Sequence, residues 1–342
     1  MAQGLAQGVG GLPKFPLSPV MCAVVLGMLW RNTLGVPSWA IRGLNWAMYR
    51  LLRVGIALVG LRLTLGGATA IAATALPVAL CCFSVALVAG ISISRVLAVP
   101  RRLGLLLAIG TAVCGCTAVV AISPVIRARH AETAFAVTCV VLFGCIAMLL
   151  YPQLAAHFLS ASPVHAGIFL GTAIHDTSQV IGAALIYSQQ AAAPAALAAA
   201  SVAKLLRNLS IAVLIPTAAW LTQRHEAAEA RAGKTPEPGT PHSSAGGTVL
   251  VPMFVLAFIG FIVVRTAGDG LFHSALWQAF VNTGYTASDL FLTCGMTAVG
   301  LSVSFTDMWR IGWRPLAAGF IVATLVGAAS LTLTCTLLHF AH

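Results

Sequence analysis

The chain has 342 residues, of which 59% are hydrophobic and only 8% are charged. Soluble domains carry about a quarter charged residues, so this composition excludes a soluble globular protein and indicates a polytopic membrane protein. The formal net charge of +11 would suggest a nucleic-acid partner in a soluble protein. Here Lys and Arg lie mostly between apolar segments, as membrane topology requires, and no nucleic-acid binding is expected.

Ten apolar segments predict an all-α polytopic membrane protein with about ten transmembrane helices. The segments are 17–35, 46–66, 70–94, 104–126, 132–151, 166–187, 195–222, 248–265, 286–305 and 315–338. An amphipathic piece over 271–282 is expected to lie at the membrane interface.

These segments divide into two predicted transmembrane repeats. We expect an N-terminal tail over 1–16, repeat 1 over 17–151, a connecting loop over 152–165, repeat 2 over 166–338 and a C-terminal tail over 339–342. The hydrophilic stretch 222–247 inside repeat 2 predicts a flexible loop.

The basic residues predict the orientation in the membrane. Alternating loops place Arg42, Arg50, Arg53, Arg95, Arg101, Arg102, Arg224, Arg231, Lys234, Arg310 and Arg314 on one side, and Lys14, Arg127, Arg129 and Arg265 on the other. The first side is then cytoplasmic, with the 222–247 loop, and both termini are outside. An alternative topology makes 104–126 and 166–187 re-entrant hairpins, and it also fits these charges.

The segment 104–126 is long enough to span a bilayer, but its centre is a weak helix. Glycines, threonines and cysteines crowd 110–117, where an ordinary span would carry Leu and Ile. Two interpretations stay open. The helix is broken at membrane depth, where protein receives its freed backbone groups, or its small residues allow close packing.

An internal repeat favours the broken helix. The hexapeptide at 114–119 recurs at 294–299 with five of six residues identical, five predicted spans later. An odd number of spans predicts two inverted five-helix repeats, with two broken helices that cross near the midplane. Two weaker matches also exist: 110–112 recurs at 171–173, and Gly55 with Gly60-Leu61 recurs as Gly295 with Gly300-Leu301.

Two such breaks would present helix N-termini to an anion, since the N-terminal end carries partial positive charge and free N–H groups. Threonine hydroxyls can add hydrogen bonds, and glycines allow the backbone to approach the ligand. The candidate substrate-binding residues are Thr111, Cys114, Gly115, Thr117, Cys294, Gly295 and Thr297.

The segment 166–187 contains a polar block of ionisable and amide residues. His175 and Asp176 at membrane depth, with Gln179, indicate proton coupling or substrate contact, because ionisable groups there are costly. The alternative is that these side chains only hydrogen-bond neighbouring helices.

Lys204, Arg207 and Asn208 share one helix face by their spacing. This face could balance an anionic substrate, or form a structural ion pair with Asp176. Arg62 is expected to anchor a helix end at the interface, and Asp289 to cap a helix N-terminus.

Several activities lack support in the sequence. No ATP-binding motif of the GxxxxGK[ST] type is present, so an ion gradient is the expected energy source. The nine cysteines fall in apolar stretches without zinc spacing, and no metal site or cofactor is predicted. An intramembrane enzyme that pairs Cys114 or Cys116 with His175 remains an alternative, but the chain is not expected to be an enzyme.

The blocks at 110–126, 132–152, 171–184, 202–208 and 295–301 resemble the YeiH-like sulfate exporters, a group of bacterial inner-membrane proteins. This resemblance covers nearly the whole chain. It implies an inverted-repeat fold related to bile-acid symporters and sodium/proton antiporters. Cys116 departs from the small polar residue expected there, and the family usually has one more N-terminal span.

The leading hypothesis is therefore a secondary transporter, an exporter, of sulfate or a related sulfur oxyanion or sulfonate. A proton is favoured over sodium as the coupling ion. A cation/proton antiporter is the alternative, although both predicted breaks lack carboxylates and only Asp176 is available. The resemblance implies a multi-pass protein of the bacterial inner membrane, and related folds often form homodimers.

Overall fold

The computed structural model describes residues 19–210, 253–272, 274–303 and 313–340, and the single positions Leu214, Thr217 and Arg224. All regular elements in these residues are helical, as predicted. The predicted tail 1–16 and, apart from Arg224, the loop 222–247 lie outside the described residues.

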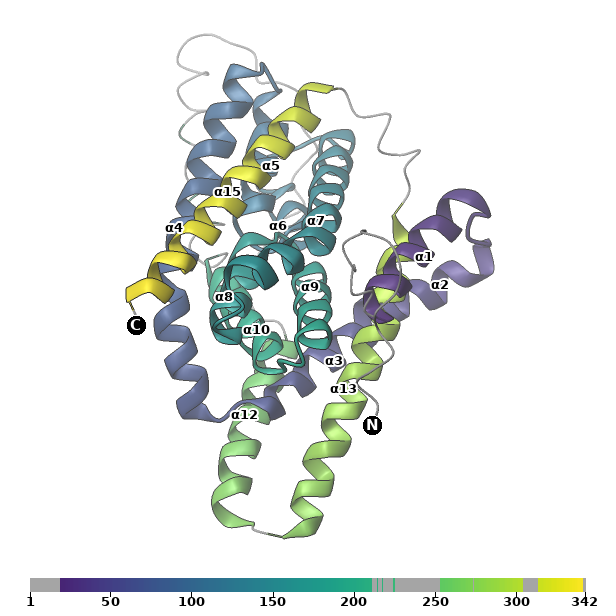
Figure 1. The fold of residues 1–342 in the computed structure, drawn as a ribbon. Coiled ribbons are helices and arrows are strands. Elements are labelled where there is room, and N and C mark those ends of the chain that lie inside the picture. Colours follow the sequence, from purple (N-terminus) through teal and green to yellow (C-terminus); the bar gives the residue numbers. More distant parts are fainter. Residues whose placement is uncertain are drawn as a thin grey trace, which may run out of the picture.

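The helices form two bundles that lie side by side (Figure 1). The peripheral bundle consists of α1 (Pro19–Thr33), α2 (Ser38–Trp46), the π-helical turn η1 (Ala47–Leu51), α3 (Leu52–Val59), the 3₁₀ turn η2 (Gly60–Arg62), α12 (Met253–Leu271) and α13 (Ala275–Ser302). The hairpin bundle consists of α4 (Leu65–Val96), α5 (Arg101–Ala112), α6 (Cys116–Ile122), α7 (His130–Phe158), α8 (Pro163–Ala173), α9 (Thr177–Gln190), α10 (Ala195–Leu209) and α15 (Trp313–Phe340).

Four of the described helices are long and apolar enough to cross a membrane on their own. They are Leu65–Val96, Ala131–Phe158, Met253–Leu271 and Trp313–His339. The predicted spans 46–66, 104–126 and 166–187 are divided into shorter helices, so the count of ten transmembrane helices is not established by helix length.

The segment 104–126 folds back on itself. Gly110 of α5 packs against Val119 of α6, where an added Cβ would lie 2.7 Å from the valine methyl group. Nine residues of straight helix would separate these positions by about 13 Å. The helix is therefore broken, as predicted, and α5 and α6 form a hairpin whose tip is 113–115.

The segment 166–187 forms a second hairpin, whose tip is 174–176. Gly167 of α8 faces Ala199 of α10, and Gly171, four residues later, faces Ala203. The two helices thus run parallel, with α10 beginning beside the start of α8. Only a chain reversal allows α9 to connect them, so α9 returns antiparallel to α8.

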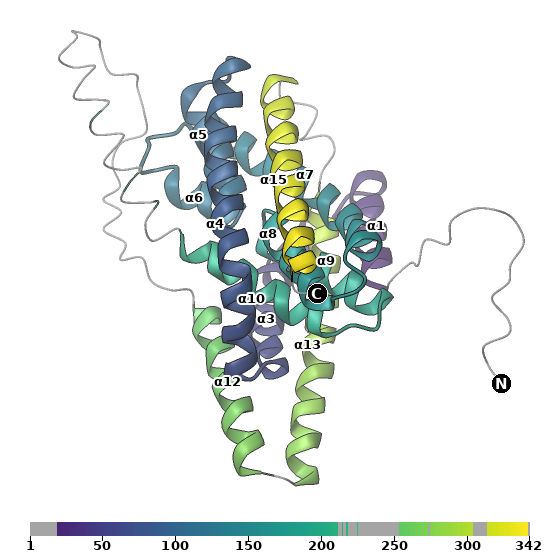
Figure 2. The same cartoon turned by 60° about the vertical axis from the view of Figure 1, so that its left-hand side comes forward.

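The two hairpins lie at opposite ends of α7 (Figures 1 and 2). Ser123, just after α6, bonds Thr133 in the first turns of α7, and Gln190 at the end of α9 bonds Gln153 near the other end of α7. The chain takes the hairpin alternative for 104–126 and 166–187, and the prediction that two broken helices cross is wrong.

The predicted break at 294–297 is also wrong, because α13 runs uninterrupted through these residues. The hydroxyl of Thr297 donates to the carbonyl of Thr293 in its own helix, 2.9 Å away. Gly295 packs against Leu52, and Gly300 against Val24. The small residues of this hexapeptide serve close helix packing, the second interpretation open for such sequences. The predicted interfacial piece 271–282 belongs to the ends of α12 and α13.

Within the peripheral bundle, an ion pair and a cation–π contact join η2 to α13. Arg62 in η2 donates to Asp289 at 2.7 Å, and its guanidinium lies over the ring of Tyr285. Asp289 sits in the middle of α13 rather than at an N-terminus. The predicted interface anchor and helix cap are therefore partners of each other.

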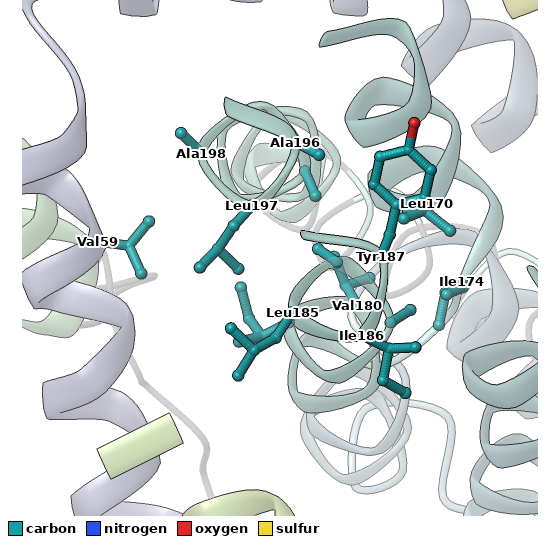
Figure 3. Packing of buried hydrophobic residues seen from close by; sticks show 14 of the residues in the cluster. Val59, Leu170, Ile174, Val180, Leu185, Ile186, Tyr187, Ala196, Leu197 and Ala198 are labelled. Atoms are coloured by element: carbon teal, nitrogen blue, oxygen red, sulfur yellow. The ribbon is translucent and has the colours of Figure 1, made fainter. Parts of the chain in front are cut away.

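Apolar side chains from both bundles form a shared core. Val59 of α3 faces Leu197 of α10 and Leu185 of α9 in Figure 3, and all three are at most 2% exposed. A second core lies inside the hairpin bundle, between α4, α5, α6, α7 and α15.

Candidate site between the two hairpin tips

Glycine geometry makes the first tip. Gly115 has φ +67°, a backbone conformation that residues with a side chain rarely adopt. Its N–H donates to the carbonyl of Gly110 at 3.0 Å, which closes α5. The prediction of a glycine-dependent break is confirmed for this segment, but the break lies at 113–115, because α6 already begins at Cys116.

A helix cap makes the second tip. Ile174 and Asp176 are extended (ψ 143° and 144°), which ends α8 and starts α9. Oδ1 of Asp176 accepts from the N–H of Ser178 at 2.9 Å and from its hydroxyl at 2.5 Å. This carboxylate thus caps the N-terminus of α9, where partial positive charge stabilises it.

The two tips touch. A Cβ at Gly115 would lie 2.9 Å from Oδ2 of Asp176 and 3.0 Å from its Cα. The missing side chain at Gly115 therefore leaves the space that the half-buried Asp176 occupies.

Lys204 of α10 binds both tips at once. Its ammonium donates to the carbonyls of Val113 (2.8 Å), Ile174 (3.1 Å) and His175. The side chain is buried, with 1% exposure. Three donated bonds use the full donor set of an ammonium group.

Arg207, one turn further along α10, binds the helix ends behind the tips. It donates to Thr111 (2.6 Å) and Ala112 (2.8 Å) of α5, and to Thr172 and Ile174 at the end of α8. The last carbonyls of a helix lack partners and carry partial negative charge. Arg207 and Lys204 satisfy them in both hairpins, and neither forms an ion pair with a carboxylate among the described residues.

These contacts identify the internal repeat that the structure uses. Both hairpins end their first arm with Gly-Thr-Ala, at 110–112 and 171–173, and α10 binds backbone carbonyls at this point in each. The weaker match of 110–112 with 171–173 therefore marks equivalent positions, whereas the stronger match at 294–299 does not.

Three polar side chains around the second tip retain unpaired buried atoms. Neither ring nitrogen of His175 makes a hydrogen bond of regular geometry, although the ring lies beside the backbone of Thr111 and the residue is only 2% exposed. Asn208 donates to Thr177 at 3.4 Å, but its Oδ1 is unpaired. Such groups are candidates for contact with a bound polar molecule.

Gln179 points away from the other polar groups of the second tip. Its amide nitrogen donates to the carbonyl of Val141 in α7 at 2.9 Å, and its unpaired Oε1 lies directly against Gly144. The structure thus does not bring Gln179 together with His175 and Asp176. Gly144 was missed by sequence reasoning, because nothing in α7 marks it as a partner of α9.

The remaining predicted residues are separated. Cys114 is buried in the first tip, Thr117 is exposed at the start of α6, and the hydroxyl of Thr111 donates to Leu107 in its own helix. Cys294 is exposed, and Gly295 is buried against α3. With Thr297, these two residues lie on α13, outside the two tips.

The architecture is that of a helical protein with two opposed hairpins whose tips meet around two buried cations. Within this class, the chain belongs to the family described as "Conserved hypothetical protein 698", which it matches over residues 5–319. This membership confirms the resemblance to the YeiH-like family.

Relatives in several bacteria are membrane proteins by name. The chain is 29% identical to a UPF0324 membrane protein of Bacillus cereus strain ATCC 10987, over 93% of this chain and 88% of the relative. It is 30% identical to one from Pseudomonas putida (93% and 85%), and 31% identical to one from Ralstonia nicotianae (92% and 84%). No solved structure matches the chain. The chain is thus a helical membrane protein of this family.

Proposed function

We propose that this protein is a secondary transporter that exports a small anion, with the substrate held at the two hairpin tips. The contact between Gly115 and Asp176, with Lys204 binding carbonyls of both tips, is the observation that carries this proposal. Irregular backbone at membrane depth is tolerated where protein or a polar cavity receives it, and transporters place their substrates at such breaks.

The charges at the tips favour an anion. Each hairpin contributes one helix C-terminus and one N-terminus, whose partial charges of about half a unit cancel in pairs. Against the two buried cations the tips carry one carboxylate, that of Asp176. A net charge of about +1 therefore remains for a substrate. Sulfate, a related sulfur oxyanion or a sulfonate is the proposed substrate class.

In this proposal Lys204 and Arg207 attract the anionic substrate through their electrostatic field and do not contact it directly. Their donors are occupied by backbone carbonyls. The groups that can contact the substrate are the ring of His175, the unpaired Oδ1 of Asn208 and the hydroxyl of Thr177. The backbone N–H groups in the first turn of α9 can add to these, except that of Ser178, which Asp176 already binds.

We propose that the coupling ion is a proton and that His175 and Asp176 exchange it. A cation/proton antiporter is the second candidate, because the half-buried carboxylate of Asp176 lies where the tips meet. The enzyme alternative has less support: the ring of His175 has no thiol partner among the described residues.

The opposed hairpins support an inverted repeat in a different order from the one predicted. We propose that α4, the first hairpin and α7 correspond to α15, the second hairpin and α10. In the second unit, α15, which corresponds to α4, then follows the hairpin and α10 in the chain instead of preceding them. Alternating access between inverted units is the general behaviour of this class of fold.

The hairpin topology also strengthens the proposed orientation in a bacterial inner membrane. Arg127 and Arg129 follow the first hairpin, so they lie at the same end of the bundle as Arg95 and Arg101. This end is proposed to be cytoplasmic, which places more basic residues inside than the ten-span topology does. Both termini are then outside, and a homodimer remains compatible with the fold.

Transport in proteoliposomes tests the function. Purified protein is reconstituted, and flux of radiolabelled sulfate, sulfite, thiosulfate and taurine is measured with and without an imposed pH gradient. We expect flux of at least one anion, with acceleration by the gradient. Asp176→Asn should uncouple flux from the gradient, whereas Asp269→Asn, in the peripheral bundle, should not.

Two results would overturn the proposal. If none of these anions moves and none raises the melting temperature, the substrate class is wrong. If sodium instead drives proton exchange, and Asp176→Asn abolishes it, the antiporter is the correct function.

A further inference from the structure

The hairpin tips are held as one unit. Lys204 and Arg207 both project from α10 and together bind carbonyls of α5, of α8 and of both tips. Moving one tip alone would leave these buried carbonyls and a buried cation without partners, which is costly. The tips are therefore unsuited to open independently of α10.

Helices inside each bundle are also held closely, through glycines that touch backbone. In the hairpin bundle, an added Cβ at Gly171 would lie 2.6 Å from the carbonyl oxygen of Ala200. In the peripheral bundle, one at Gly300 would lie 3.0 Å from Cα of Val24. Backbone cannot move aside, so these contacts keep the helices of each bundle in fixed register.

The surface between the bundles is different in kind. Gly182 of α9 faces Met296 of α13 across this surface, where an added Cβ would lie 2.5 Å from the terminal methyl group. It also faces the sulfur of Met148 at 2.7 Å, but Met148 belongs to α7 of its own bundle. Both methionines are fully buried. Methionine is unbranched and has three rotatable side-chain bonds, so it repacks more readily than other apolar residues.

The rest of this surface is apolar. Figure 3 shows Val59 of the peripheral bundle opposite Leu185 and Leu197 of the hairpin bundle. A hydrogen bond from the N–H of Leu65 to the hydroxyl of Thr266 joins the bundles beside the extended residue Leu63, where the chain passes from η2 to α4. This connection can act as a pivot.

We propose that the hairpin bundle moves as one rigid body against the peripheral bundle. In this proposal the packing contact between Gly182 and Met296 stabilises the conformation described here relative to the second one. This inference rests on the proposed transport function, which requires two states. In this state the methionine methyl group occupies the notch that Gly182 leaves in α9. Movement of one bundle along the interface would take the methyl group of Met296 away from Gly182.

The proposal predicts how single methyl groups shift the two states. Gly182→Ala fills the notch and should disfavour the present state by about fivefold or more, the lower end of what overpacking by one methyl group causes. The fold should survive, because the atoms in the way are the flexible ends of methionines. Met296→Ala in the same chain removes the contact across the interface and should restore most of the original population. Met148→Ala, which relieves only the contact inside the hairpin bundle, should not.

Spin-label distances measure this shift without any substrate. In a cysteine-free variant, labels at Val88 of α4 and Leu290 of α13 report on the two bundles, and labels at Val88 and Leu150 report within the hairpin bundle. All three positions are exposed. We expect two distances for the first pair, with populations changed by Gly182→Ala and recovered in the double variant, and one unchanged distance for the second pair.

Gly171→Ala is the matched control, because its Cβ meets backbone inside one bundle. It should lower the melting temperature without changing the balance of the two distances. Identical distance distributions in the parent and Gly182→Ala would overturn the inference, as would a change within the hairpin bundle. Bundle motion without anion flux would refute only the proposed function, and anion flux between rigid bundles would refute only this inference.

Discussion

Gly115 packs directly on Asp176, and this contact joins two hairpins that enter the fold from opposite ends of α7. The first residue supplies a left-handed backbone turn with no side chain, and the second supplies a carboxylate that caps the next helix. Each of the two residues thus completes its own tip and leaves room for the other.

Gly115→Ala should disturb both the left-handed turn at Gly115 and its close contact with Asp176. The positive φ is unfavourable for alanine by about 1–3 kcal/mol, and the new methyl group would press on Asp176. We expect a lower melting temperature in detergent and loss of anion flux. Gly260→Ala, whose Cβ would meet nothing within 4 Å, should leave both unchanged. Equal melting temperatures for the two variants would contradict this account of the tip.

Arg207→Lys should be strongly destabilising although the charge is kept. The guanidinium binds four carbonyls, two of α5 and two at the end of α8, and an ammonium with three donors cannot satisfy all four. Each buried acceptor left unpaired costs about 1–3 kcal/mol. Arg101→Lys, on the exposed start of α5, is the control. The measurement is the melting temperature of each purified variant, and a loss no larger than in the control would refute the helix-end role.

Much of this fold could be predicted from hydropathy and local chemistry. Apolar length and charge separate the long helices from their connections, and the crowding of glycine and threonine marks the weak centre of 104–126. The polar block at His175 and Asp176 marks the second tip. Both signals are local, so a single sequence can display them.

The segment equivalent to 104–126 in the internal repeat could not be chosen from the sequence. Residue identity between two segments can reflect a shared preference for small residues rather than equivalent positions in the fold. The hexapeptide at 294–299 shares five residues with 114–119 since close helix packing and a hairpin tip both favour small residues. Its one hydroxyl, that of Thr297, bonds within α13. Only the contacts of Arg207 with 111–112 and with Thr172 show that the shorter match is the equivalent one.

Gly144 and Gln179 should be energetically coupled. The carboxamide oxygen of Gln179 lies where a Cβ at position 144 would be placed, while its nitrogen donates to Val141. Gly144→Ala should therefore destabilise the protein in the parent chain and much less in a Gln179→Ala chain. A double-variant cycle on thermal or denaturant unfolding should give a coupling of about 0.5–3 kcal/mol. Additive effects would show that the side chain avoids α7.

Cys294→Ser should leave anion flux and stability close to the parent values. The residue is exposed on an unbroken helix of the peripheral bundle and is remote in role from the two tips. Cys114→Ser, at the buried first tip, is the comparison, and it should reduce flux because it places a hydroxyl beside Gly115. Flux measured in proteoliposomes checks both, and a larger loss from Cys294→Ser would return the substrate site to α13.

The hairpin topology predicts which connections share a side of the membrane. Residues 98 and 129 flank the first hairpin, and 161 and 191 flank the second, and all four are exposed. Because each hairpin returns to the end where it began, 98 and 129 should lie on one side and 161 and 191 on the other. Single cysteines at these positions in a cysteine-free chain can be labelled with an impermeant maleimide. Ala98→Cys and Arg129→Cys should react in inverted vesicles, and Ala161→Cys and Ala191→Cys in intact spheroplasts.

A crossing-helix topology gives the opposite pairing. Each broken helix would then span the membrane, so 98 and 129 would react from different sides, as would 161 and 191. Labelling after the membrane is made permeable controls for buried thiols, since all four should react in that case. The pairing within each hairpin decides between the topologies even if the absolute orientation is reversed. If 98 and 129 separate, the proposed inverted relation between the two hairpins fails, and with it the argument that the excess of basic residues at this end marks the cytoplasmic side.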